Sequence, residues 1–209
     1  MPDVEPNGSG PTTEEERAER GPALDPELQA RRRRALSMIR TFGDPVLKAK
    51  ALEVTVFDDV LAEEIRRMSE LMEDALGIGL AATQVGVMHR VLIYRTSADG
   101  PLVAAVNPAV EWHSGESDVA EEGCLSLPGV VVDVERPLYV RVTASSETGE
   151  DVTIEASGLE ARVLQHEIDH LDGVLMIDRV DREQRREAMR VLRGGAPNER
   201  ERTTEVSPS

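Results

Sequence analysis

Two histidines stand four residues apart in residues 165–171, Gln-His-Glu-Ile-Asp-His-Leu. On an α-helix this spacing puts His166 and His170 on one face, with Cβ atoms about 5–6 Å apart, so that both imidazoles reach one metal ion. Glu167 lies beside the first histidine, where a carboxylate can exchange a proton with metal-bound water. The pattern predicts a helix that binds a catalytic metal ion, although a helix whose two histidines bind no metal would have the same sequence.

A catalytic metal ion usually has three protein ligands and one open position, so a third ligand is needed. The longer zinc-peptidase pattern would place it at position 176, which is Met176. His89 and His113 lie in segments that we expect to be a strand end and a loop, and nothing around them indicates a ligand.

The only cysteine, Cys124, lies in residues 121–129, Glu-Glu-Gly-Cys-Leu-Ser-Leu-Pro-Gly. Most free cysteines are small buried hydrophobic residues. Gly123, however, lets the backbone approach another group closely, and a single cysteine forms no internal disulfide. A thiolate with two imidazoles makes a sulfur–nitrogen site with an open fourth position. Cys124, His166 and His170 are therefore the predicted metal ligands.

A glycine-rich block covers residues 77–86, Gly-Ile-Gly-Leu-Ala-Ala-Thr-Gln-Val-Gly. It lacks the lysine of a phosphate-binding loop and the third glycine of dinucleotide spacing, and the preceding segment is helical. We expect its backbone to pair with an extended substrate, while the amide of Gln84 donates to a developing oxyanion.

These three blocks, in this order, resemble the signature motifs of peptide deformylase. Residues 39–47 are also similar to the start of that family's domain, and the similarity runs from about residue 38 to about residue 192. The resemblance implies hydrolysis of the N-formyl group from the N-terminal methionine of newly synthesised proteins, with release of formate. It also implies one divalent ion per chain, Fe²⁺ in the cell, with Zn²⁺, Ni²⁺ or Co²⁺ in purified protein.

The resemblance further implies roles for individual residues. Glu167 moves the proton, while the Leu125 N–H and the Gln84 amide hold the oxyanion. The residues expected to bind the methionine side chain and the peptide backbone are Ile78, Gly79, Gly123, Leu125 and Val163. Those expected to support the ligands are Glu122 and Arg136, as an ion pair beneath the site, and Asp169. For Asp169 we expect either a bond to a ligand imidazole or exposure to solvent, and we favour exposure.

Composition limits the class of protein. The chain has 209 residues, a net charge of −16 and only 2% aromatic residues. No apolar run approaches the length of a membrane span, and no apolar stretch follows the acidic N-terminus, so we expect no membrane partner and no export signal. The lone cysteine suits the reducing cytoplasm. The negative charge disfavours nucleic-acid recognition in general, but arginines outnumber acids in residues 178–193, which makes a transient ribosome contact a hypothesis.

The pattern of hydrophobic residues predicts an α+β fold, in which antiparallel sheets surround a central buried metal-binding helix and a helix ends the domain. We expect a disordered tail at 1–24, a helical extension at 25–37, a catalytic domain at 38–193 and a disordered tail at 194–209. Within the domain, the predicted helices are 59–76, 158–170 and 182–192. The predicted strands are 87–94, 102–108, 110–113, 130–134, 138–144, 151–157 and 174–178.

Two other functions fit part of the pattern. A zinc endopeptidase would share the histidine motif but would need a glutamate or histidine as its third ligand. An inactive metal-binding module that associates with ribosomes would be expected to have lost Glu167 or Gln84, and the chain has both.

Overall fold

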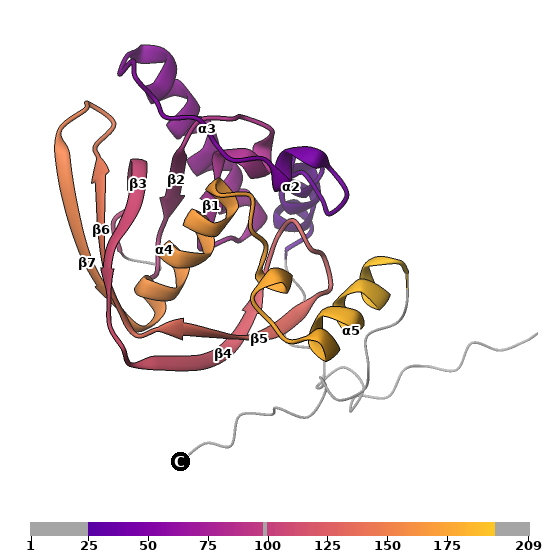
Figure 1. Cartoon of the computed structure of the whole chain (residues 1–209). Helices are drawn as coiled ribbons and strands as arrows, with labels where there is room; N and C mark the ends of the chain where they lie inside the picture. The colour runs from indigo at the N-terminus through magenta and orange to yellow at the C-terminus, as the bar shows by residue number, and fades with distance from the viewer. Residues whose placement is uncertain (1–24, 98–99, 195–209) are drawn as a thin grey trace, which may run out of the picture.

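The computed structural model describes residues 25–97 and 100–194 (Figure 1). The predicted tail at 1–24, and that at 194–209 beyond Gly194, lie outside the described residues. The helices are α2 (Pro26–Leu36), α3 (Asp59–Ala75), α4 (Gly158–Leu171) and α5 (Arg182–Leu192), with 3-10 turns η1 (Pro45–Lys48), η2 (Ala82–Val85) and η3 (Met176–Asp178). The strands are β1 (Gly79–Ala81), β2 (Val91–Tyr94), β3 (Val103–His113), β4 (Ser117–Gly123), β5 (Val131–Pro137), β6 (Tyr139–Ser145) and β7 (Asp151–Ser157).

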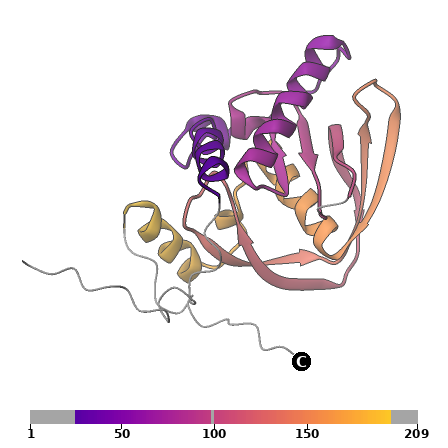
Figure 2. The ribbon, with the colours of Figure 1, turned by 180° about the vertical axis from the view of Figure 1, so that it is seen from behind.

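The strands form two antiparallel sheets. One has five strands in the order β1-β2-β3-β6-β7, and the other is the β4-β5 pair. Helix α4 lies in the centre, and it contacts both sheets (Figures 1 and 2). The predicted α+β fold with antiparallel sheets around a central helix is confirmed.

Helix α4 is buried because apolar residues recur at helical spacing. Ala161, Leu164, Ile168 and Leu171 pack into the core with strands of the five-stranded sheet. The helix ends before Gly173, which has a φ of +72°, and a Cβ there would lie 2.7 Å from the backbone oxygen of Lys48. Glycine is therefore required at the point where the chain leaves the metal helix.

Helix α3 packs on β1 and β2 of the five-stranded sheet, and α2 packs on α3. Asp58 caps α3 by accepting from the N–H groups of Val60 and Leu61. The buried face of α3, formed by Leu61, Ile65, Met68, Met72 and Ala75, is the face that the sequence pattern predicts. Asp25 caps α2, which packs against α3, and Arg31 of α2 pairs with Asp74 of α3 (Figures 1 and 2).

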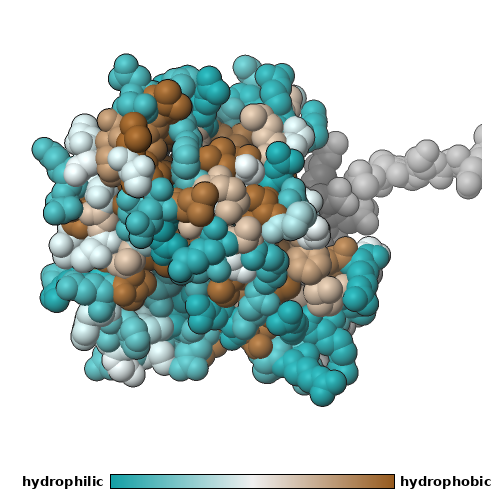
Figure 3. Space-filling view, turned by 45° about the horizontal axis from the view of Figure 1, so that its top comes forward, coloured by the Kyte–Doolittle hydropathy of each residue, from teal (hydrophilic) through white to brown (hydrophobic). Residues whose placement is uncertain are grey.

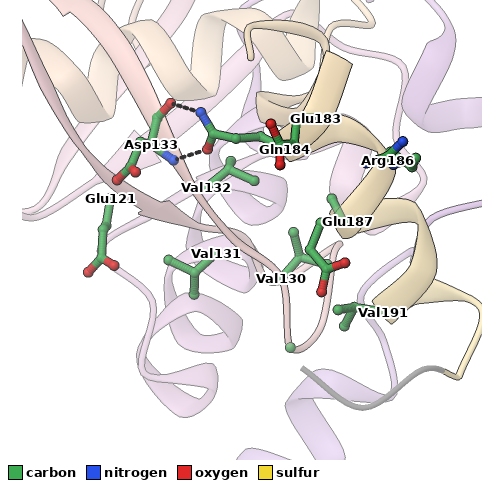
Figure 4. Close-up of a pocket in the computed structure, with 12 residues that line it drawn as sticks. Glu121, Val130, Val131, Val132, Asp133, Glu183, Gln184, Arg186, Glu187 and Val191 are labelled. Atoms are coloured by element: carbon green, nitrogen blue, oxygen red, sulfur yellow. Dashed lines mark hydrogen bonds between the residues drawn. The ribbon is translucent and has the colours of Figure 1, made fainter. Parts of the chain in front are cut away.

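Helix α5 packs on strand β5, as Figure 4 shows. The side-chain amide of Gln184 donates to the backbone oxygen of Asp133 and accepts from its N–H, at 3.3 and 2.8 Å. The side chain of Gln184 thus binds backbone groups of β5 that a neighbouring strand would otherwise bind. Val130, Val131, Val132 and Val191 line a cavity beside this contact.

Several predicted strands were wrong in detail. Residues 174–178 form no strand, since 176–178 make up the turn η3, and β2 begins at Val91 rather than at residue 87. Residues 102–108 and 110–113 belong to the single strand β3, whose register shifts around Pro108, because proline cannot donate to the ladder. Strands β1 and β4 were missed, since one is short and the other is mostly acidic and polar.

The surface is mixed in polarity. On the face in Figure 3, apolar residues form separate patches among polar ones. None of the helices in the described residues has the length and apolar character needed to cross a membrane.

Candidate active site

The structure brings the three predicted ligands together. Sγ of Cys124 lies 3.2 Å from Nε2 of His170, and the ligand atoms of these residues and His166 all lie within 4.8 Å of one another. The two imidazoles, both on α4, meet at an interplanar angle of 74°. Cys124 directly follows β4, so the end of that strand supplies the third ligand to the helix face.

The donor set fits a divalent transition metal. A thiolate with two imidazoles is a ligand set that zinc and iron accept, and it leaves a position open for water or substrate. Glu167, which lies beside this set, is 4% exposed, and its Oε2 has no hydrogen-bond partner in the described residues. A buried oxygen of this kind needs a polar partner, which a metal-bound water would supply. Burial raises the pKa of Glu167 to about 7.

Glu122 orients the imidazole of His166 through the ring nitrogen Nδ1. Its Oε2 lies 2.9 Å from Nδ1 of His166, and Arg136 donates to both carboxylate oxygens, at 2.7 and 2.9 Å. Arg162 adds a second guanidinium, which donates to the same carboxylate at 2.9 Å. Burial opposes ionisation of Glu122, but the hydrogen bonds from Arg136 and His166 hold its pKa well below the usual range. The carboxylate therefore fixes the ring so that Nε2 faces Cys124.

Asp169 corrects one prediction. We expected it to face solvent or to accept from a ligand imidazole, but it is buried and bonds to neither histidine. Its carboxylate accepts from Arg136 at 2.7 Å and from Arg179 at 3.0 Å. Since Arg136 also binds Glu122, Asp169 acts on the site through the arginine.

Gln84 is held at the other side of the ligand set. Its Oε1 accepts from the Ala81 N–H at 2.9 Å, which directs the amide nitrogen towards Ser126 at 3.2 Å and Cys124 at 3.7 Å. The side chain is only 2% exposed. A fixed amide donor therefore stands beside the metal ligands, with its orientation set by the turn η2.

A cleft of about 470 Å³ opens over these groups. The predicted residues that line it are Ile78, Gly79, Gln84, Glu122, Gly123, Cys124, Leu125, Val163, His166 and Glu167. His170, Arg136 and Asp169 do not line the cleft, and all three are buried. Ile78 is half-exposed and Val163 is buried, so the cleft has an apolar wall that reaches from the surface to the ligands.

Sequence reasoning missed several residues of the site. Arg162 ties Glu122 to β5 by donating to the backbone oxygen of Val134, and Thr83 donates to the backbone oxygen of His170. Arg32 and Leu36 of α2 also line the cleft. No sequence signal links α2 to the motifs, since the contact depends on how α2 packs against α3.

The known proteins that this chain resembles identify its family. The profile of the family described as polypeptide deformylase matches residues 36–186. The peptide deformylase of Acidothermus cellulolyticus is 48% identical over 159 residues, which cover 76% of this chain and 87% of that protein. The chain belongs to the polypeptide deformylase family.

Other relatives agree with this assignment. The peptide deformylase of Thermotoga neapolitana is 48% identical over 142 residues, covering 68% of this chain and 85% of that protein. The crystal structure of a peptide deformylase from Synechococcus elongatus in complex with actinonin matches with a TM-score of 0.71 and 41% identity, over 76% of this chain and 88% of that one. As a member of this family, the chain is a metal-dependent hydrolase that removes N-formyl groups from newly synthesised peptides.

Proposed function

We propose that Cys124, His166 and His170 hold the catalytic metal ion, and that Glu167, Gln84 and Leu125 carry out deformylation beside it. The observation that carries this proposal is the convergence of the three ligand atoms within 4.8 Å, next to a buried carboxylate and a fixed amide. A bound divalent ion would supply a water acidified towards a pKa of about 7 and would polarise the formyl group.

The chain's own groups then perform the proton transfer and charge stabilisation. Glu167 accepts a proton from the attacking water and delivers it to the departing amine. The side-chain amide of Gln84 and the backbone N–H of Leu125 donate to the oxyanion. Such a donor typically contributes about 10²–10³ in rate when it is fixed in advance, as Gln84 is by its bond to Ala81.

The substrate is the N-formylmethionyl end of a nascent peptide. Its methionine side chain fits the apolar wall formed by Ile78, Leu125 and Val163. β1 and β4 are edge strands of their sheets, and Gly79 and Gly123 at their ends line the cleft. An extended peptide can therefore pair with either edge by backbone hydrogen bonds, which are independent of the nascent chain's sequence.

We also propose iron as the metal in the cell, a cytoplasmic location and a transient contact with the ribosome. The thiolate–imidazole set suits Fe²⁺ as well as Zn²⁺, and a lone cysteine suits a reducing compartment. For the ribosome, the best surface is α5, where Arg182, Arg186 and Arg193 have no ion pair within the described residues. No membrane and no specific nucleic-acid sequence is proposed as a partner.

The test is formate release by anaerobically purified protein, together with metal analysis. We expect one divalent ion per chain and hydrolysis of formyl-Met peptides, with no cleavage of unformylated casein. Casein cleavage without formate release would instead support a zinc endopeptidase. Binding of metal with neither activity would support an inactive metal-binding module.

A further inference from the structure

Apart from the proposed base Glu167, the charged residues that line the cleft fall into two groups. Glu122, Arg162 and His166 bind one another or nearby backbone. Arg32 and Glu121, in contrast, have neither a hydrogen bond nor an ion pair through their side chains in the described part of the chain, although both line the cleft. They are therefore free to interact with a substrate.

Arg32 comes from a segment that precedes the residues matched by the family profile. The family profile begins at residue 36, whereas α2 covers Pro26–Leu36. The helix is nevertheless held in place, because Asp25 caps it, Arg31 pairs with Asp74 of α3, and Ala35 is buried. An element that lies almost entirely before the matched residues thus presents a cation to the active-site cleft.

The four consecutive arginines of α2 differ in their surroundings. Arg31 is bound to Asp74, and Arg34 lines a separate groove between α2 and α3. Arg33 is exposed and lines neither that groove nor the cleft. Of these four arginines, only Arg32 lines the catalytic cleft. A row of solvent-exposed arginines on one helix therefore does not explain its position.

We infer that Arg32 is a specificity-determining residue that favours nascent peptides with an acidic side chain shortly after the formylmethionine. This inference rests on the proposed function. Arg32 lines the cleft together with Gly77, Ile78 and Gly79, the segment along which the peptide backbone is proposed to run. Side chains of an extended peptide point alternately to opposite sides, so either the third residue or the second and fourth residues point to this wall.

The effect is modest and electrostatic. Because Arg32 is exposed, an ion pair with the substrate should change kcat/KM by roughly 1.5- to 5-fold. Reversal of the charge replaces attraction by repulsion, so Arg32→Glu should change the acidic-to-basic preference by about two- to tenfold. The difference should shrink as salt is raised, since exposed charges are screened over about 8–10 Å at 0.1–0.15 M ionic strength.

The experiment measures formate release from formyl-Met-Ala-Ala-Ala amide and from versions with Asp or Lys at the second, third or fourth position. We expect the wild type to favour Asp over Lys at one of these positions, and Arg32→Glu to reverse that preference. Arg33→Glu is the matched control, with the same charge change on the same helix.

A preference that changes no more in Arg32→Glu than in Arg33→Glu would overturn the inference. The same holds if Arg32→Glu lowers kcat/KM equally for Asp, Lys and neutral peptides. If wild-type protein releases no formate from the neutral peptide, the proposed function itself is wrong. This outcome differs from a failure of the Arg32 inference, in which the wild type still releases formate.

Discussion

Gly79 of β1 lies against the carboxylate of Glu167 on α4. A Cβ at position 79 would stand 2.9 Å from Cδ of Glu167 and closer still to Oε1. Real Cβ contacts are essentially never this short, so one of the two groups would have to move. The glycine is therefore needed for the position of Glu167 as well as for the approach of a substrate backbone.

Gly79→Ala should consequently reduce deformylation by displacing Glu167. We expect kcat/KM to fall by about 10²-fold or more, as for loss of general acid–base catalysis, while metal content is retained. Gly115→Ala is the control, since a Cβ there meets nothing within 4 Å. Near-normal kcat/KM in Gly79→Ala would mean that Glu167 adjusts without loss, and that its observed position is not required.

Glu167→Gln tests the proton transfer directly. The amide keeps the size of the carboxylate and leaves the three ligands untouched, so the metal should remain bound at about one ion per chain. Activity should fall by about 10²–10⁴-fold. A variant that stays within about threefold of wild type would exclude Glu167 as the base.

Glu122→Gln tests the support of His166. Arg136 is buried between Glu122 and Asp169, so loss of one carboxylate charge leaves it poorly compensated. Breaking a buried pair typically costs about 3–5 kcal/mol, and loss of a partner behind a ligand weakens metal binding about 10- to 100-fold.

Chemical denaturation and chelator competition measure these two effects. Glu121→Gln is the matched control, because its side chain is exposed and has no ion pair within the described residues. Equal unfolding free energies and metal affinities in both variants would contradict the role of Glu122.

Much of the fold followed from the sequence because its long elements have strong patterns. The apolar positions of α3 and α4 recur at helical spacing, and β7 alternates between polar and apolar residues, so these elements lie where predicted. Strand β4 could not be predicted, because its Ser-Asp-Val-Ala-Glu-Glu-Gly sequence has little intrinsic strand preference. It is a strand because it pairs along its whole length with β5.

The site residues also divide into those that the local sequence predicts and those that only tertiary packing places. The ligands and Glu167 belong to short motifs whose spacing has a chemical meaning, and the structure brings them together. Asp169 was misplaced because its partners, Arg136 and Arg179, lie on separate elements and no local pattern links them. Arg32 was missed for a similar reason, since only tertiary packing brings α2 to the cleft.

Cys124 should make the iron enzyme sensitive to peroxide. It is the only thiol in the chain, and a thiolate beside a redox-active ion is readily oxidised. We expect inactivation to be faster in the Fe²⁺ form than in the Ni²⁺ or Co²⁺ forms, with mass spectrometry locating the added oxygen on Cys124. Equal rates in all three forms would mean that the metal does not promote the oxidation.

Helix α5 provides the test of ribosome contact. Arg185 pairs with Asp178 and Arg190 with Glu187, whereas Arg182, Arg186 and Arg193 have no such pair in the described residues. Reversal of the unpaired three should therefore remove the available positive charge with little effect on stability. The triple variant with Glu at these positions should hydrolyse a free formyl-Met peptide normally but co-sediment less with ribosomes at low salt.

The control for this variant makes the same change in net charge elsewhere. Arg33, Arg66 and Arg67 are exposed on α2 and α3, so their reversal should leave co-sedimentation at low salt unchanged if α5 is the docking surface. Arg66 and Arg67 pair with Glu63, and Arg66 also pairs with Glu70, but such exposed pairs are screened by solvent and contribute little to stability. An equal loss of co-sedimentation in both triple variants would mean that the overall charge of the protein, rather than α5, causes the effect. Wild-type protein that never co-sediments would leave α5 as scaffold that packs on β5 through Gln184.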